Sequence, residues 1–270
     1  VHEAAGHAPI IADPKYAHYL HHYGEVSSKA ISSKDDYNLY VAIRQLSDIK
    51  EDPSSTAEQI NRAEKALGDA IEQISYISEA AYLARMNWWT VEYGLIGDIK
   101  NPKIYGAGLL SSVSESQNCL SEDVKKISFS LDCINQSYDI TEPQPQLFIT
   151  PDFAKLSEVL EEMADKMAFR IGGSVALEKA IQAKTVCTAE YESKVQVSGK
   201  IVNIIKDDFK NPIYMQFEGP TQISRFGNEL DGHGGDYHCH GFGSPIGKIQ
   251  NLHKPVCDFN DDDIENTNLV

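Results

Sequence analysis

The sequence lacks both a long apolar run and a basic run. No stretch of about 18 apolar residues is present, which is the length that a membrane-spanning helix requires, and no charged-then-apolar leader of the signal-peptide type is visible. The 24 Lys and Arg residues are scattered among 40 Asp and Glu residues, which gives a net charge of −16. Because nothing would neutralise phosphates in bulk, we expect no nucleic-acid partner and no membrane partner.

Cysteine is scarce, and no CxxC pair occurs. The five cysteines are an odd number at wide spacings: Cys119, Cys133, Cys187, Cys239 and Cys257. This pattern favours free thiols in a reducing compartment, so the sequence predicts a cytoplasmic protein. The content of 41% hydrophobic and 24% charged residues is otherwise typical of a soluble globular protein.

The first two-thirds of the chain has helical spacing. Helices are expected over 1–23, broken by Pro9 and Pro14, over 36–49, over 58–87 as one long helix, and over 152–169 behind Asp152 as its cap. The pattern then alternates over 194–205, 213–217 and 221–224, which indicates short strands. The predicted fold is mainly α, with a helical core (1–185), a small C-terminal β-rich appendage (190–250) and a loose acidic tail (258–270).

The start of the chain carries two histidines around a glutamate, in an HExxxH arrangement. His2 and His7 are five residues apart, whereas metal-binding histidines on an α-helix are usually four apart. On an α-helix the two side chains would point about 140° apart, so a distortion near Gly6 would be needed to bring them to one metal. Since the first candidate ligand is residue 2 and the first residue is Val1, we expect a fragment of a longer protein.

Glu92 is the candidate third ligand. It is the one carboxylate in the apolar segment WWTVEYGLI (88–96), and a buried carboxylate needs a metal, a cation or several hydrogen-bond donors. Two imidazoles and one carboxylate form the facial triad of Fe(II) enzymes that use O₂. The alternative for Glu92 is a salt bridge to Arg85 or Lys100.

Four segments in this order, HEAAGH, WWTVEYGLIG, KIYGAGLLSS and ITEPQP, resemble the tetrahydropterin-dependent aromatic amino acid hydroxylases. The likeness is greatest to long-form bacterial phenylalanine 4-hydroxylases and is strong over residues 1–150. It implies a monooxygenase that hydroxylates an aromatic amino acid, foremost phenylalanine to tyrosine, with Fe(II), O₂ and tetrahydrobiopterin as cofactors and reactants.

The resemblance also implies roles for individual residues. His2, His7 and Glu92 match the iron ligands of the family, and Glu3 and Ala84 match residues at the pterin. Trp88, Gly108 and Ser111 match residues near the substrate, and the matching serine also fixes an iron-bound histidine. Beyond the metal ligands, no catalytic residue is expected.

The sequence departs from the family in three respects. The segment between His7 and Glu92 is longer than in the best-known animal enzymes, and Asn87 replaces an aromatic residue. The family's pterin-binding loop and substrate-carboxylate arginine precede the HExxxH motif and are absent here. A chain without them can bind iron and still be inactive on its own.

A second cluster contains His233, His238, Cys239 and His240 among glycines. It is interpreted either as a polar loop or as a transition-metal site. For the whole chain, two further functions are considered: a zinc-dependent hydrolase in which Glu3 is the general base, and a non-catalytic binding protein on the same scaffold.

Overall fold

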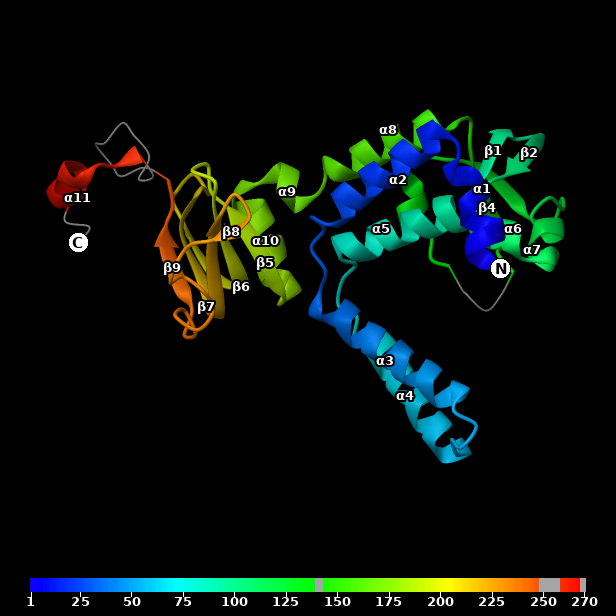
Figure 1. Cartoon of the computed structure of the whole chain (residues 1–270), viewed down its shortest axis with the longest axis horizontal. Coiled ribbons are helices and arrows are strands. Elements are labelled where there is room, and N and C mark those ends of the chain that lie inside the picture. Colours follow the sequence, from blue (N-terminus) through cyan, green and yellow to red (C-terminus); the bar gives the residue numbers. More distant parts are fainter. Residues whose placement is uncertain (139–142, 248–257, 268–270) are drawn as a thin grey trace. The chain divides into compact units, whose positions relative to one another are not determined.

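The computed structural model describes residues 1–138, 143–247 and 258–267. The chain forms two compact units, Val1–Arg170 and Ile171–Val270 (Figure 1). The domain boundaries expected from the sequence, at 185–190 and 258, remain predictions. Within the described residues, no helix has both the length and the apolar character needed to cross a bilayer.

Helices surround the core of the first unit. Asp13 caps the second of them by accepting a hydrogen bond from the Lys15 amide at 2.8 Å, and Pro14 occupies its first position. Asp152 caps another at Lys155, as the sequence predicts. The α-helices of this unit outside the hairpin described below, in chain order, are α1 (Ala8–Ile11), α2 (Pro14–Ser27), α5 (Glu79–Asn87), α6 (Ala107–Ser111), α7 (Val113–Asn118), α8 (Phe153–Ala164) and α9 (Ala168–Ile171), the last ending across the unit boundary.

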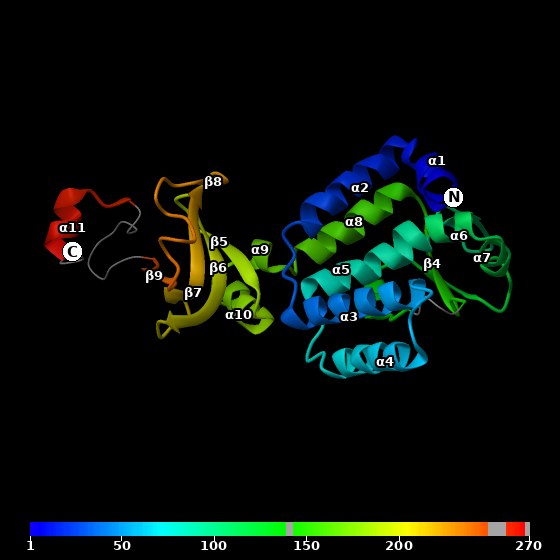
Figure 2. The same ribbon diagram turned by 60° about the horizontal axis from the view of Figure 1, so that its bottom comes forward.

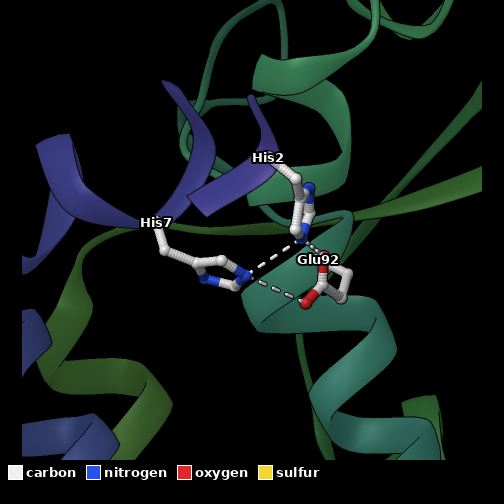
Figure 3. Close-up of side chains that lie close together, drawn as sticks. All are labelled: His2, His7 and Glu92. Carbon is white, nitrogen blue, oxygen red and sulfur yellow. Dashed lines mark hydrogen bonds and ion pairs between the residues drawn. The ribbon is translucent and has the colours of Figure 1, made fainter. Parts of the chain in front are cut away.

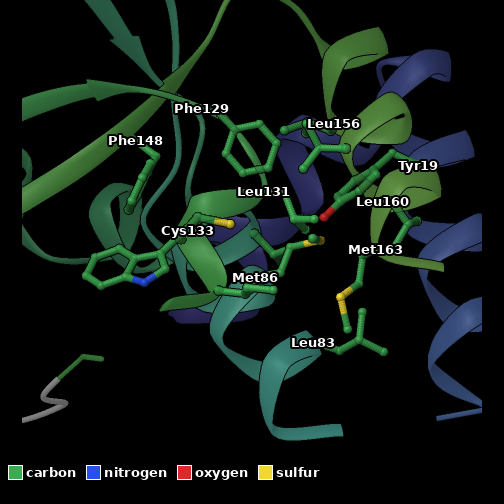
Figure 4. Packing of buried hydrophobic residues seen from close by; sticks show 14 of the residues in the cluster. Tyr19, Leu83, Met86, Phe129, Leu131, Cys133, Phe148, Leu156, Leu160 and Met163 are labelled. Carbon is green, nitrogen blue, oxygen red and sulfur yellow. The ribbon is translucent and has the colours of Figure 1, made fainter. Parts of the chain in front are cut away.

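The first unit also contains a four-stranded sheet, in the order β2-β1-β4-β3. Its strands are β1 (Leu95–Asp98), β2 (Asn101–Ile104), β3 (Lys125–Ser128) and β4 (Gln146–Thr150). Strand β4 runs parallel to both β1 and β3. Apolar side chains from β4, α5, α8 and the 3₁₀ turn η3 (Leu131–Asn135) pack together, including Met86, Cys133 and Leu160 (Figure 4). This core fixes the segments that carry the candidate ligands.

The prediction of one long helix over 58–87 is wrong. This stretch forms two helices, α4 (Ala57–Glu72) and α5, separated by a non-helical segment. Helix α4 pairs with α3 (Lys34–Glu51) in a hairpin that extends from the rest of the unit (Figures 1 and 2). Ser78 caps α5 by accepting from the Ala81 amide at 3.0 Å, so a new helix starts where the apolar periodicity continues unbroken.

The second unit is a curved antiparallel sheet with one helix, α10 (Gly173–Ala183), packed against β6. Its strands are β5 (Val186–Glu190), β6 (Val195–Lys206), β7 (Pro212–Arg225), β8 (Asn228–Glu229) and β9 (Phe242–Pro245). The two runs expected at 213–217 and 221–224 are one strand, β7. A short helix, α11 (Asp261–Thr267), lies in the segment expected to be loose.

The predicted fold class is therefore wrong: the chain is mixed α and β, with sheets of four and five strands. The first sheet escaped prediction because its strands are only four or five residues long. Runs of four or five residues have too few positions to establish a two-residue period, and they cannot be distinguished from pieces of helix.

Candidate metal centre

His2 and His7 lie on one turn of π-helix, η1 (His2–His7), not on an α-helix. In a π-helix the hydrogen bonds join residues five apart, so the wider turn brings the two side chains to the same side. Gly6 lies at the contact of η1 with α6, where an added Cβ would be 2.7 Å from the carbonyl oxygen of Ala107. The distortion that the five-residue spacing requires is thus present, and Gly6 permits the close contact of η1 with α6.

Glu92 ends a second π-helical turn, η2 (Trp88–Glu92). The GAGLLS segment packs directly on this turn, since a Cβ on Gly106 would be 2.5 Å from the Glu92 carbonyl oxygen. Arg85, the alternative partner, instead donates to the carbonyl oxygen of Ile134 at 3.0 Å. No ion pair among the described residues joins Glu92 to Arg85 or Lys100; its ionic contacts are the two histidines.

The three candidate ligands converge (Figure 3). The Nε2 atoms of His2 and His7 are 3.0 Å apart, and each lies 3.4 Å from a carboxylate oxygen of Glu92. Metal–ligand bonds of about 2.1 Å place neighbouring donors about 3.0 Å apart in octahedral and about 3.4 Å apart in tetrahedral geometry. The separations therefore fit a single transition-metal ion, and no other triad of this kind occurs in the described part of the chain.

Ring orientation separates this pair from the second histidine cluster. His233 Nδ1 and His238 Nε2 are also 3.0 Å apart, but their rings are nearly parallel with centroids 5.3 Å apart, as in a direct hydrogen bond. The rings of His2 and His7 are perpendicular with centroids only 4.7 Å apart. At the same nitrogen separation, the shorter centroid distance means that the two rings do not point straight at each other, and both Nε2 atoms also lie 3.4 Å from Glu92.

Ser111 sets the protonation pattern of His2. Its hydroxyl donates to the carbonyl oxygen of Ala107 at 2.8 Å, so it accepts from Nδ1–H of His2, also at 2.8 Å. With the proton on Nδ1, the neutral imidazole presents the lone pair of Nε2 to Glu92 and His7. The side chain of His2 is 45% exposed, whereas those of His7 and Glu92 are 20% exposed, so the centre is open on the side of His2.

Aromatic side chains flank the centre. Trp88 is stacked between Tyr93 and Tyr138, with ring centroids 4.6 and 4.3 Å away. Burial raises the pKa of Tyr16 and of Tyr93, and the negative charge of Glu92 raises both further. Both hydroxyls therefore stay neutral beside the carboxylate. The sequence did not predict that Tyr138 stacks on Trp88, because the two residues are 50 positions apart in the chain.

The remaining predicted site residues lie in the same unit but outside the triad. Glu3 and Ala84 are exposed, and Gly108 packs against Glu92 and Tyr93. Their roles at the pterin and the substrate remain predictions. In the second cluster, Cys239 and His240 are exposed, and the two other histidines acquire no third ligand among the described residues.

A family model described as biopterin-dependent aromatic amino acid hydroxylase matches residues 65–210, more than half of the chain. The match includes Trp88, Glu92 and Ser111 but begins after the two histidines. The phenylalanine-4-hydroxylase of Pseudomonas aeruginosa is 27% identical over 162 residues, which cover 60% of this chain and 45% of that protein. The Chromobacterium violaceum enzyme is 31% identical over 168 residues, 57% of this chain and 42% of that protein.

Solved structures also match. An iron- and phenylalanine-bound phenylalanine hydroxylase from Chromobacterium violaceum shares 31% identity, with a TM-score of 0.31, and the alignment covers 41% of this chain and 45% of that one. A TM-score this low does not establish a common arrangement. The chain spans less than half the length of these relatives.

Proposed function

Because the chain belongs to the biopterin-dependent aromatic amino acid hydroxylases, we propose that it is the iron-holding part of a monooxygenase. The proposed reaction is the hydroxylation of an aromatic amino acid, foremost phenylalanine to tyrosine, with Fe(II), O₂ and tetrahydrobiopterin. The single observation that supports it most strongly is the convergence of His2, His7 and Glu92 at metal-ligand distances. Small molecules are the proposed partners, and a cytoplasmic location is proposed from the odd number and wide spacing of the cysteines in the sequence.

The donor set suits Fe(II). Two neutral imidazoles and one carboxylate leave a divalent ion with net positive charge and three open positions. Bound there, iron would supply the redox chemistry that activates O₂ together with the reduced pterin. The residues of this chain hold the ion in place: Ser111 keeps the Nε2 lone pair of His2 available, and Gly6 lets η1 approach α6.

Trp88 and its neighbours are proposed to line the substrate side. The rings of Tyr93 and Tyr138 stack on Trp88 and restrict its motion. Glu3 and Ala84 are proposed to contact the pterin, and Gly108 the substrate.

The zinc hydrolase is not supported. Two histidines and one glutamate also bind zinc in hydrolases, but the family match and both relatives are hydroxylases.

The full-length parent protein provides the test of the reaction. It should form tyrosine from phenylalanine, with O₂ uptake that depends on both Fe(II) and tetrahydropterin, and Glu92→Ala should abolish this uptake. A parent that binds iron yet converts none of phenylalanine, tyrosine and tryptophan would instead favour a non-catalytic binding protein. Lys100→Ala is the matched control, since Lys100 lies outside the centre and should leave turnover unchanged.

A further inference from the structure

The α3–α4 hairpin leaves large apolar side chains in water. The two helices pack mainly against each other, and only Ala42 and Ala63 are fully buried between them. Tyr40 remains 59% exposed and Ile43 45% exposed. A pair of helices buries too little apolar surface to be stable alone, which is why helical bundles usually contain three or four helices.

The root of the hairpin is fixed to the rest of the unit. The Asp35 carboxylate accepts from the backbone amide and the hydroxyl of Ser75, at 3.1 and 2.8 Å. The Glu79 carboxylate accepts from the Ile31 amide at 3.2 Å and from the Ala168 amide at 2.8 Å. The hairpin is therefore fixed at its base and extends from the rest of the unit (Figures 1 and 2).

Two of the exposed apolar residues of α3, Tyr40 and Ile43, belong to a regular stripe, and Tyr37, which is 63% exposed, lies outside it. Asp36, Tyr40, Ile43, Ser47 and Lys50 follow one another at steps of four, three, four and three along α3. This is the spacing of the contact positions in helices that pack side by side. A second stripe at steps of three, four and three, formed by Leu39, Ala42, Leu46 and Ile49, is more buried and faces α4.

We propose that the stripe on α3 binds the same stripe of a second copy of this chain, antiparallel, about a two-fold axis at Ile43. Asp36 and Lys50 lie seven residues before and after Ile43. In that arrangement Asp36 of each copy faces Lys50 of the other, so two ion pairs flank the apolar centre. The stripe is complementary to itself, which is the condition for an interface with two-fold symmetry.

Charge explains why a second copy fits this surface. The chain as a whole carries −16, so two copies repel each other over most of their surfaces. The stripe is an exception, because its one acid and one base cancel. In the single chain Lys50 pairs with Glu64 at 2.9 Å, and the Asp36 carboxylate accepts from the Ser33 amide at 2.7 Å. Both contacts can persist in the dimer, because the ammonium group has three donors and the carboxylate has two oxygens. The contact is one helix wide, so the dimer is weak and depends on concentration.

Cysteine cross-linking of the full chain tests the axis directly. In a background with Cys187, Cys239 and Cys257 changed to Ser, Ile43→Cys places one thiol opposite its own copy. It should form a disulfide-linked dimer on mild oxidation. Gln45→Cys, exposed on another side of the same helix, should form no disulfide-linked dimer under the same conditions. Equal cross-linking of the two variants, or none in Ile43→Cys, would overturn the proposal.

Sedimentation equilibrium gives a second, independent readout. The unmodified chain should show a monomer–dimer equilibrium that Ile43→Glu abolishes, whereas Ile71→Glu on α4, a matched change at a 53% exposed position, should retain it. Lys50→Glu should weaken the dimer about tenfold or more, and Lys65→Glu, which alters net charge equally, should not. An unmodified chain that is monomeric at all concentrations would refute the interface. None of these outcomes depends on iron or turnover.

Discussion

The hydroxyl oxygen of Ser111 lies 2.8 Å from Nδ1 of His2, 109 residues away in the chain. Because the same hydroxyl donates to the Ala107 carbonyl oxygen, the imidazole must be the donor in this contact. Ser111 on α6 thereby fixes which nitrogen of His2 on η1 can bind a metal.

Replacing Ser111 should therefore weaken metal binding without unfolding the protein. Removal of such a hydrogen-bond partner lowers metal affinity about 10- to 100-fold, so we expect Ser111→Ala to lose that much affinity in a competitive titration with Fe(II) or Co(II). The control is Ser116→Ala, whose hydroxyl bonds only the nearby Val113 carbonyl oxygen. Equal affinities for the two variants would show that Ser111 does not orient His2.

We expect a glycine-to-alanine substitution to have opposite effects at Gly6 and at Gly24. At Gly6 a Cβ would be 2.7 Å from the Ala107 carbonyl oxygen, whereas at Gly24 nothing lies within 4 Å. Overpacking of this kind costs about 1–3 kcal/mol, so Gly6→Ala should displace η1 and reduce metal affinity roughly 10- to 100-fold. Gly24→Ala, inside α2, should preserve affinity and stabilise the fold by about 0.5–1 kcal/mol. Unchanged metal affinity in Gly6→Ala would mean that η1 does not depend on this contact.

Glu79 should contribute substantially to the stability of the first unit. It is 7% exposed and accepts from the amides of Ile31 and Ala168. Its removal leaves buried donors without a charged acceptor, so Glu79→Ala should lower the free energy of unfolding by about 2–3 kcal/mol. Urea denaturation followed by circular dichroism measures this. The control is Glu72→Ala, because Glu72 is exposed. If both substitutions lowered the free energy of unfolding by a similarly small amount, Glu79 would not have the stabilising role assigned to it.

Cys133 should make the fold sensitive to alkali. Burial, with a smaller contribution from the Asp132 charge, raises the pKa of this thiol from 9.0 to about 12. Because the folded state favours the neutral thiol, the contribution to stability is full below pH 9 and is lost as the pH rises toward 12. The melting temperature should fall over this range, and Cys133→Ala should make the fall shallower. An identical slope in both proteins would rule out Cys133 as the cause.

The sequence identified the candidate ligands, but it did not show how they come together. His2, His7 and Glu92 were identifiable because histidine pairs and a lone carboxylate in an apolar segment are conspicuous. Their convergence depends on two π-helical turns and on the close contact of Gly6 with Ala107, which are tertiary features without a local signal. The Ser111 contact came only from family resemblance.

The fold was predicted less well, for physical reasons that differ between elements. Helices α2, α3 and α8 carry capping residues and apolar periodicity, and the sequence located them. The break between α4 and α5 is invisible in that periodicity, because apolar spacing continues through residues 73–78. Strands β1 to β4 are too short to show alternation, so the first sheet depended on long-range pairing that the sequence alone does not reveal.

The central claim is that one iron ion is held by His2, His7 and Glu92. The most direct test is an anomalous difference map, recorded at the iron absorption edge from crystals of the chain grown anaerobically with Fe(II). We predict one peak about 2.0–2.2 Å from Nε2 of both histidines and from the Glu92 carboxylate. A peak at His233 and His238 instead, or no peak near Glu92 at saturating iron, would contradict it.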